Sequence, residues 1–69
     1  MVNMRIDREK LAVALVRADL TGKQLAERAQ ISTGTVTAVR TGKSCSRYTA
    51  EALAAGLGVE LSEILAEKG

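Results

Sequence analysis

Two helix-start signals, eleven residues apart, constrain this chain more than any other feature of its sequence. Thr21 is followed three residues later by Gln24, the spacing of a capping box in which each side chain satisfies a backbone N–H of the other residue. Ser32 repeats the signal, and apolar residues flank both caps as hydrophobic staples. Residues 20–43 therefore predict two short helices separated by only two residues.

So short a connection makes the second helix turn sharply against the first, and the apolar residues at helical spacing then face inward. These residues are Leu25, Ala26, Ala29, Ile31, Val36 and Val39. The result is a helix-turn-helix pattern over about residues 21–41. A small helical bundle with a common corner between two helices would show the same spacing, so the pattern alone leaves the function open.

The outer helices are predicted from similar signals. Asp7 is a good N-cap for a helix over residues 8–19, and Ser46 caps another helix that ends at Gly58. A weaker signal around Glu60 predicts a fifth helix, whose leucines and isoleucine would offer a dimer contact. Residues 1–5 stay unassigned, although the alternation through Ile6 permits a short extended segment.

The composition bounds the class of protein. A chain of 69 residues has room for one domain with a thin core, so the whole of residues 1–69 is interpreted as one domain. The absence of proline, phenylalanine and tryptophan, with many alanines and leucines, favours helices. No apolar run is long enough to span a membrane, and we expect a cytosolic protein.

The single cysteine and the absence of histidine exclude several kinds of chemistry. Cys45 cannot form an internal disulfide, and no zinc site of the usual Cys/His kind is expected. Without histidine, clustered carboxylates or a glycine loop for phosphate, we expect neither an enzyme nor a cofactor. Cys45 is interpreted as a bystander thiol whose pKa basic neighbours lower only modestly, with a redox switch as the alternative.

The charges are distributed unevenly along the chain. Residues 22–48 hold five basic side chains and one acidic side chain, whereas residues 49–69 hold one basic and four acidic side chains. A basic middle and an acidic end are expected of a protein that presents one face to nucleic acid. Ordinary surface charge is the alternative. Tyr48, the only aromatic residue, is interpreted as a packing or phosphate-contact residue, because single-strand binders usually need several aromatic faces.

The run LTGKQLAERAQISTGTVTAVRTGK, followed by LAAGLGVELSEIL, resembles the phage repressor/Cro (XRE-type) helix-turn-helix family. The resemblance covers roughly residues 11–65. Its most specific features are Ala26, Ile31, Ser32, Val36, Gly42 and the run Leu57, Gly58 and Val59. It implies an all-α, lambda-repressor-like bundle of about five short helices. It also implies a homodimer that binds double-stranded operator DNA with the second helix of the motif in the major groove.

The resemblance also implies where DNA is contacted: at the start of the first motif helix, along the second and in the loop that follows. The residues at these places are Thr21, Lys23, Ser32, Thr33, Gly34, Thr35, Thr37, Ala38, Arg40, Lys43, Ser44 and Arg47. None of the groove-facing residues is Arg, Gln or Asn, the side chains that identify a base by two hydrogen bonds. We therefore expect modest direct readout, with affinity carried mainly by Lys43 and Arg47.

Three departures from the family pattern concern neighbouring parts of the motif. Gly22 replaces the glutamine that commonly anchors a phosphate, and Gln30 replaces the usual turn glycine. Leu15 and Arg40 stand where many members have an arginine and a glutamate in an ion pair. Replacing both partners predicts an apolar contact beneath Leu15 and an Arg40 that turns outward.

A transcriptional regulator is the function that these patterns favour. A protein-interaction module of the same fold, such as an antitoxin or accessory factor, is the alternative, because a fold does not dictate a function.

Overall fold

A computed structural model describes residues 3–66, and within them four α-helices begin at the caps that the sequence predicts. The helices are α1 (Arg8–Ala18), α2 (Gly22–Ala29), α3 (Thr33–Arg40) and α4 (Arg47–Leu57). The side chains of Asp7, Thr21, Ser32 and Ser46 each accept a hydrogen bond from a backbone N–H in the first turn. The predicted helix over 8–19 ends one residue earlier, because Asp19 turns into the left-handed region.

The turn between α2 and α3 contains a strained residue at Gln30, which stands where the family usually has a glycine. Gln30 has a φ of 60°, which costs a non-glycine residue about 1 kcal/mol. A hydrogen bond within the turn offsets part of this cost: the N–H of Ile31 donates to the carbonyl oxygen of Ala26 at 3.0 Å. At the other end of α3, Gly42 has a φ of 104° and directs the chain away from the helix.

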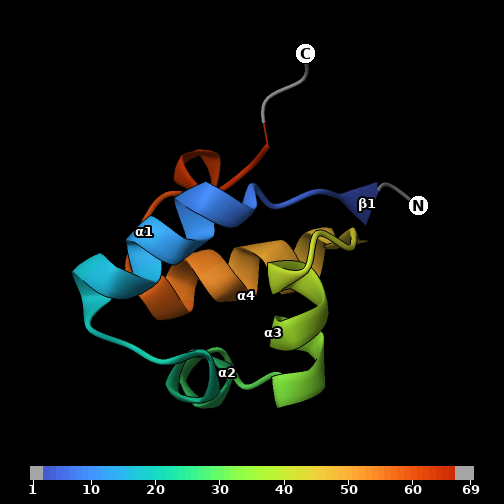
Figure 1. Cartoon of the computed structure of the whole chain (residues 1–69). Helices are drawn as coiled ribbons and strands as arrows, with labels where there is room; N and C mark the ends of the chain where they lie inside the picture. Colours follow the sequence, from blue (N-terminus) through green and yellow to red (C-terminus); the bar gives the residue numbers. More distant parts are fainter. Residues whose placement is uncertain (1–2, 67–69) are drawn as a thin grey trace.

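The core is built around α4, which runs through the middle of the molecule with α1 above it, α2 below it and α3 across its end (Figure 1). Leu25, Leu53 and Ile64 are fully buried there. The crossing of α2 over α4 is close because Gly56 has no side chain: a Cβ atom at this position would lie 3.0 Å from Cδ1 of Leu25. The first motif helix, α2, is thus fixed against α4, and the second, α3, packs on α2 and α1.

The fold is mostly helical, as predicted, but it is not all-α, because two short strands pair near the N-terminus and before α4. The strand β1 (Asn3–Met4) pairs antiparallel with β2 (Cys45–Ser46), and Ile6 forms an isolated bridge with Leu65. The side chain of Ile6 is only 2% exposed, so it anchors the extended N-terminal segment to the core. Local sequence patterns do not report a pairing between residues more than forty positions apart.

The prediction of a fifth helix was also wrong. Residues Leu61–Glu63 form a single turn of 3-10 helix, η1, which begins where the N–H of Glu60 donates to Glu63 Oε2 at 3.1 Å. Ile64 is then fully buried and Leu65 pairs with Ile6, which pulls the chain into an extended form after one turn. The apolar surface expected to remain uncovered on this segment is therefore largely packed into the core.

Candidate nucleic-acid interface

The inner face of α3 fixes which of its residues are presented to solvent. Val36 and Val39 are each 1% exposed and hold the helix against the core. The opposite face consists of Thr33, Gly34 and Thr37, which are exposed, and Ala38, which is half-buried. These four residues are the groove-facing set predicted from the sequence. They form a surface without charge or long side chains, suited to close approach and to weak hydrogen bonding through hydroxyl groups.

Two of the predicted contact residues use their hydroxyl groups within the protein. Ser32 Oγ accepts a hydrogen bond from the N–H of Thr35 at 3.1 Å and lies 2.8 Å from Thr35 Oγ1. The two hydroxyl groups therefore form one capping unit at the start of α3. Their first role is to begin the helix, and the helix start positions Thr33 and Gly34 at its exposed end.

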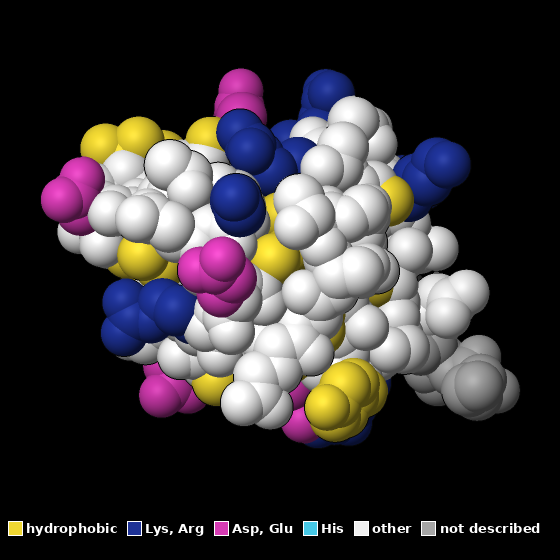
Figure 2. Space-filling view, turned by 90° about the horizontal axis from the view of Figure 1, so that it is seen from below, with side chains coloured by type: hydrophobic (Ala, Val, Ile, Leu, Met, Phe, Trp, Pro, Cys, Tyr) yellow, Lys and Arg dark blue, Asp and Glu magenta, His cyan; other side chains and the backbone are white. Residues whose placement is uncertain are grey.

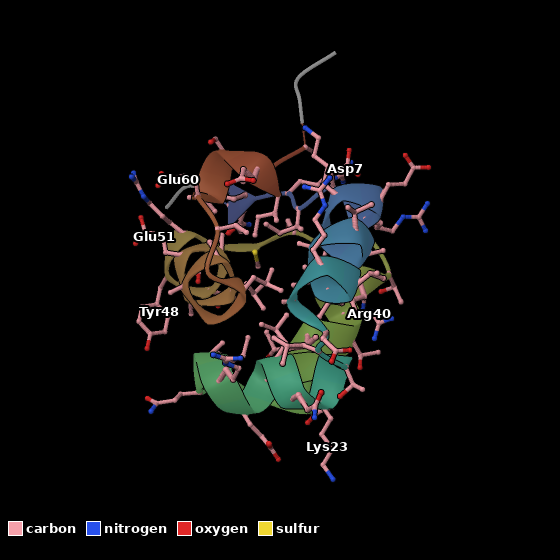
Figure 3. All side chains as sticks on the ribbon, turned by 90° about the vertical axis from the view of Figure 1, so that its left-hand side faces the viewer. Asp7, Lys23, Arg40, Tyr48, Glu51 and Glu60 are labelled. Carbon is pink, nitrogen blue, oxygen red and sulfur yellow. The ribbon has the colours of Figure 1, made fainter. Side chains whose placement is uncertain are left out.

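The start of α2 is organised by the predicted capping box. Thr21 Oγ1 accepts from the N–H of Gln24 at 3.1 Å, and Gln24 Oε1 accepts from the N–H of Thr21 at 2.9 Å. Lys23 follows directly and is exposed. Figure 3 shows Lys23 and Arg40 on the same side of the molecule, although they come from different helices. The structure thus brings two basic side chains together beside the motif.

Arg40 explains why a glycine stands at position 22. A Cβ atom on Gly22 would lie only 2.6 Å from Nη1 of Arg40, so the guanidinium group occupies the space that a side chain would fill. Arg40 is exposed, as predicted. Leu15, which stands where many family members have the arginine of the ion pair, is buried at 5% exposure. The positive charge of Arg40 therefore lies at the start of α2, where the replaced glutamine would have stood.

The loop after α3 presents Lys43 and Ser44, both exposed, from a backbone fixed by a hydrogen bond from the N–H of Lys43 to the carbonyl oxygen of Ala38 at 3.1 Å. Arg47, at the start of α4, is different. Its Nε donates to Glu51 Oε2 at 2.8 Å, and both side chains are more than half exposed. Such a pair contributes little to stability, but it partly neutralises the charge that Arg47 offers to a phosphate.

Two basic residues beside this loop were not among the predicted contacts. Arg5 and Arg8 line a shallow depression of about 540 Å³ together with Thr41 and Gly42, but Asp7 and Glu9 line it as well. The Cδ atom of Arg8 lies 3.7 Å from the position that a Cβ atom on Gly42 would take. The pairing of β1 with β2 brings this N-terminal segment to the end of α3. Two positive charges therefore lie beside the loop, with two carboxylates nearby that offset them.

Some of the basic side chains lie close together on the surface. In the view from below, several Lys and Arg side chains lie along the top and upper right of the molecule, others lie at the left and at the lower edge, and Asp and Glu side chains are scattered among them (Figure 2). The group at the top and upper right is a local concentration of positive charge, which attracts a polyanion.

Tyr48 and Cys45 differ in exposure. Tyr48 is 74% exposed, so its interpretation as a packing residue was wrong, whereas contact with a phosphate stays a prediction. Figure 3 shows Tyr48 on the same side as Glu51, the partner of Arg47, and on the opposite side from Arg40. Cys45 is 9% exposed and packs in the core. Burial raises the pKa of its thiol, so the expected lowering by basic neighbours was wrong. A buried, protonated thiol fits a bystander better than a redox switch.

Within residues 3–66, no three His, Cys, Asp or Glu side chains gather in a way that would hold a metal ion. No helix in the same range is long and apolar enough to cross a membrane.

The family model of the Cro/C1-type helix-turn-helix DNA-binding domain matches residues 10–67. This match covers most of the chain, and the chain therefore belongs to the Cro/C1-type helix-turn-helix family of DNA-binding domains. A comparison with curated proteins found no match.

Two solved structures of PhpD contain a similar domain. One is PhpD with cadmium complexed with hydroethylphosphonate, and the other is native PhpD with cadmium atoms. Each is 30% identical to this chain with a TM-score of 0.81 over 96% of it. The present chain spans only 14% of the length of either PhpD chain, so the likeness concerns one part of a much longer protein.

Proposed function

We propose that this chain is a sequence-specific double-stranded DNA-binding transcriptional regulator that acts as a homodimer on operator DNA. The observation that carries the proposal is the exposed face of α3, with its short side chains, flanked by basic residues from three separate segments. A helix that offers no long side chain approaches the floor of a major groove closely, while the flanking charges contact the phosphates on either side.

The proposed contacts divide into two groups. Thr33, Gly34, Thr37 and Ala38 face the bases, with Ser32 and Thr35 holding the start of their helix. The phosphate contacts are Thr21, Lys23, Arg40, Lys43, Ser44 and Arg47, to which we add Arg5 and Arg8. In a homodimer, two such surfaces would contact half-sites about one helical turn, or roughly 34 Å, apart.

The alternative is that the domain serves as a protein-interaction module, because a fold does not dictate a function. In the PhpD structures a similar domain is part of a far longer chain. Selection of bound duplexes from random DNA separates the two functions. A regulator enriches a common, two-fold repeated sequence, whereas a module that binds only protein enriches none.

Thr37→Ala should shift base preference without changing the electrostatic part of binding. The substitution removes a hydroxyl group from the exposed face of α3 but keeps every formal charge. We expect a change at one position of each half-site, worth less than the roughly 1–3 kcal/mol of a two-bond base contact. The measurement is affinity for a panel of single-base operator variants over a range of salt. A flatter salt dependence would contradict the assignment of Thr37 to the bases.

Gly22→Ala should weaken DNA binding only when Arg40 is present. The added methyl group displaces the guanidinium group, which is the flexible end of a long side chain, so the fold should tolerate it. Stability should not fall, because alanine favours helix over glycine by up to about 1 kcal/mol. We expect a coupling energy of about 0.5 kcal/mol or more between Gly22→Ala and Arg40→Ala in DNA affinity. Strictly additive effects would contradict the proposed role of this position.

A further inference from the structure

The outer face of α1 carries apolar residues that the fold leaves uncovered. Val13 is 50% exposed and Val16 is 78% exposed. Beside them lies an open groove of about 630 Å³, to which Leu57 and Val59 contribute further apolar surface. Val13, Leu57 and Val59 line the same groove and so form one apolar surface, unlike the isolated exposed apolar side chains that any surface shows, whereas Val16 lies outside the groove lining. The face lies on α1, the end of α4 and η1, and no residue of α3 or of the loop after it lines the groove.

Four charged side chains line the groove, and two of them bond within the protein: Lys10 Nζ donates to the carbonyl oxygen of Leu65, and Glu63 Oε2 accepts from the N–H of Glu60. The other two are Glu9, four residues before Val13, and Arg17, four residues after it. Residues four apart lie on one side of a helix. Glu9 and Arg17 are about 12 Å apart along the helix axis and cannot pair with each other. Within residues 3–66, neither side chain forms an ion pair.

We propose that this face binds a second copy of the same chain, with the two α1 helices antiparallel across a two-fold axis at Val13. In this arrangement Val13 meets Val13 of the second copy. Glu9 then lies opposite Arg17 of the second copy, and the symmetry repeats the pair. A two-fold contact requires a patch complementary to itself, and one negative and one positive charge at equal distances from an apolar centre meet that requirement.

The proposal rests on the homodimer of the proposed function and identifies its interface. It also differs from the simplest alternative. Glu9 is in the first turn of α1 and Arg17 in the last, where the helix dipole favours these charges without any partner. The two explanations differ for the variant in which both charges are reversed. If Glu9 and Arg17 pair across a dimer, reversing both charges restores the pair. If each interacts only with the dipole of its own helix, reversing both charges loses both interactions.

The test is the dimer dissociation constant of the full chain without DNA, measured by sedimentation equilibrium at low salt. Glu9→Arg and Arg17→Glu should each weaken the dimer about tenfold, because each places two like-charged pairs at the interface. The double variant Glu9→Arg/Arg17→Glu should return to within about threefold of the parent. Val13→Glu should leave a monomer. Glu27→Arg, the same charge change on α2, should leave the dissociation constant unchanged.

Circular dichroism establishes that each variant is folded, and a half-exposed or exposed position should tolerate all four changes. A monomeric parent, or a double variant that is a weaker dimer than both single variants, would overturn the interface. If the monomer still selects a DNA sequence, the DNA-binding proposal stands while the interface fails. A dimer that follows the charge pattern but selects no DNA leaves the interface intact and contradicts the proposed function instead.

Discussion

Ala26→Leu should lower the free energy of unfolding by about 1–3 kcal/mol, a large fraction of the roughly 3.5–10 kcal/mol expected of a domain of 69 residues. Ala26 is 2% exposed on α2, and its carbonyl oxygen accepts the hydrogen bond that closes the turn toward α3. Three additional carbon atoms cannot be placed there unless α2 moves away from the core. Chemical denaturation followed by circular dichroism measures the change directly.

Ala55→Leu is the matched control. Ala55 is an exposed alanine in the middle of α4, so the same increase in volume meets solvent there. We expect a change within about 0.5 kcal/mol, as for most surface substitutions. If Ala26→Leu unfolds at the same denaturant concentration as Ala55→Leu, the close packing of α2 is not where we place it.

Lys43→Ala should remove the largest single share of DNA affinity. Lys43 is exposed in the loop after α3 and, unlike Arg47, forms no ion pair with an acidic residue in the described part of the chain. If it contacts one phosphate in each subunit of a dimer, its loss should flatten the slope of log K against log salt by about 1.8. The loss of affinity should be nearly equal for all operator variants, because phosphates carry no sequence.

Two other substitutions calibrate this result. Arg28→Ala removes the same charge from the exposed end of α2, outside the proposed contacts, and should change the slope by much less. Arg47→Ala should have an intermediate effect, because Glu51 already shares its charge. Equal slopes for Lys43→Ala and Arg28→Ala would mean that only net charge matters and that the loop makes no phosphate contact.

The helix starts were predictable because a cap is a local feature. Asp7, Thr21, Ser32 and Ser46 each bond a backbone N–H two or three residues away, and a signal of that range is complete within a few letters of sequence. The resemblance identified Gln30 as the residue that replaces the usual turn glycine, and Gln30 is left-handed in the structure.

What the sequence did not predict depends on contacts between distant residues. The pairing of β1 with β2 joins the N-terminal segment to the start of α4, and the bridge from Ile6 to Leu65 joins it to the segment after η1. Together with the burial of Ile64, they also explain why the last segment extends after one turn. Leu61, Ile64 and Leu65 have helical spacing in the sequence. In the structure they pack against the core from one turn of 3-10 helix and an extended segment, which the spacing alone does not predict.

In the candidate interface, too, some features follow from local sequence and others depend on contacts between distant residues. The exposed face of α3 follows from helical periodicity once Val36 and Val39 are placed inward. The contributions of Arg5 and Arg8 follow from strand pairing, and the position of Arg40 over Gly22 follows from the crossing of two helices. Periodicity therefore identifies which residues face outward, whereas tertiary contacts decide which charges surround them.

The most direct test of DNA recognition is the affinity of the unmodified protein for its selected duplex and for an unrelated duplex of equal length, between about 50 and 200 mM salt. We predict that binding to both duplexes weakens steeply with salt. The selected duplex should bind about a thousandfold more tightly, at the low end of specific recognition, because the groove-facing side chains are short. Equal affinity for the two duplexes, or binding that does not depend on salt, would contradict sequence-specific recognition of DNA by this domain.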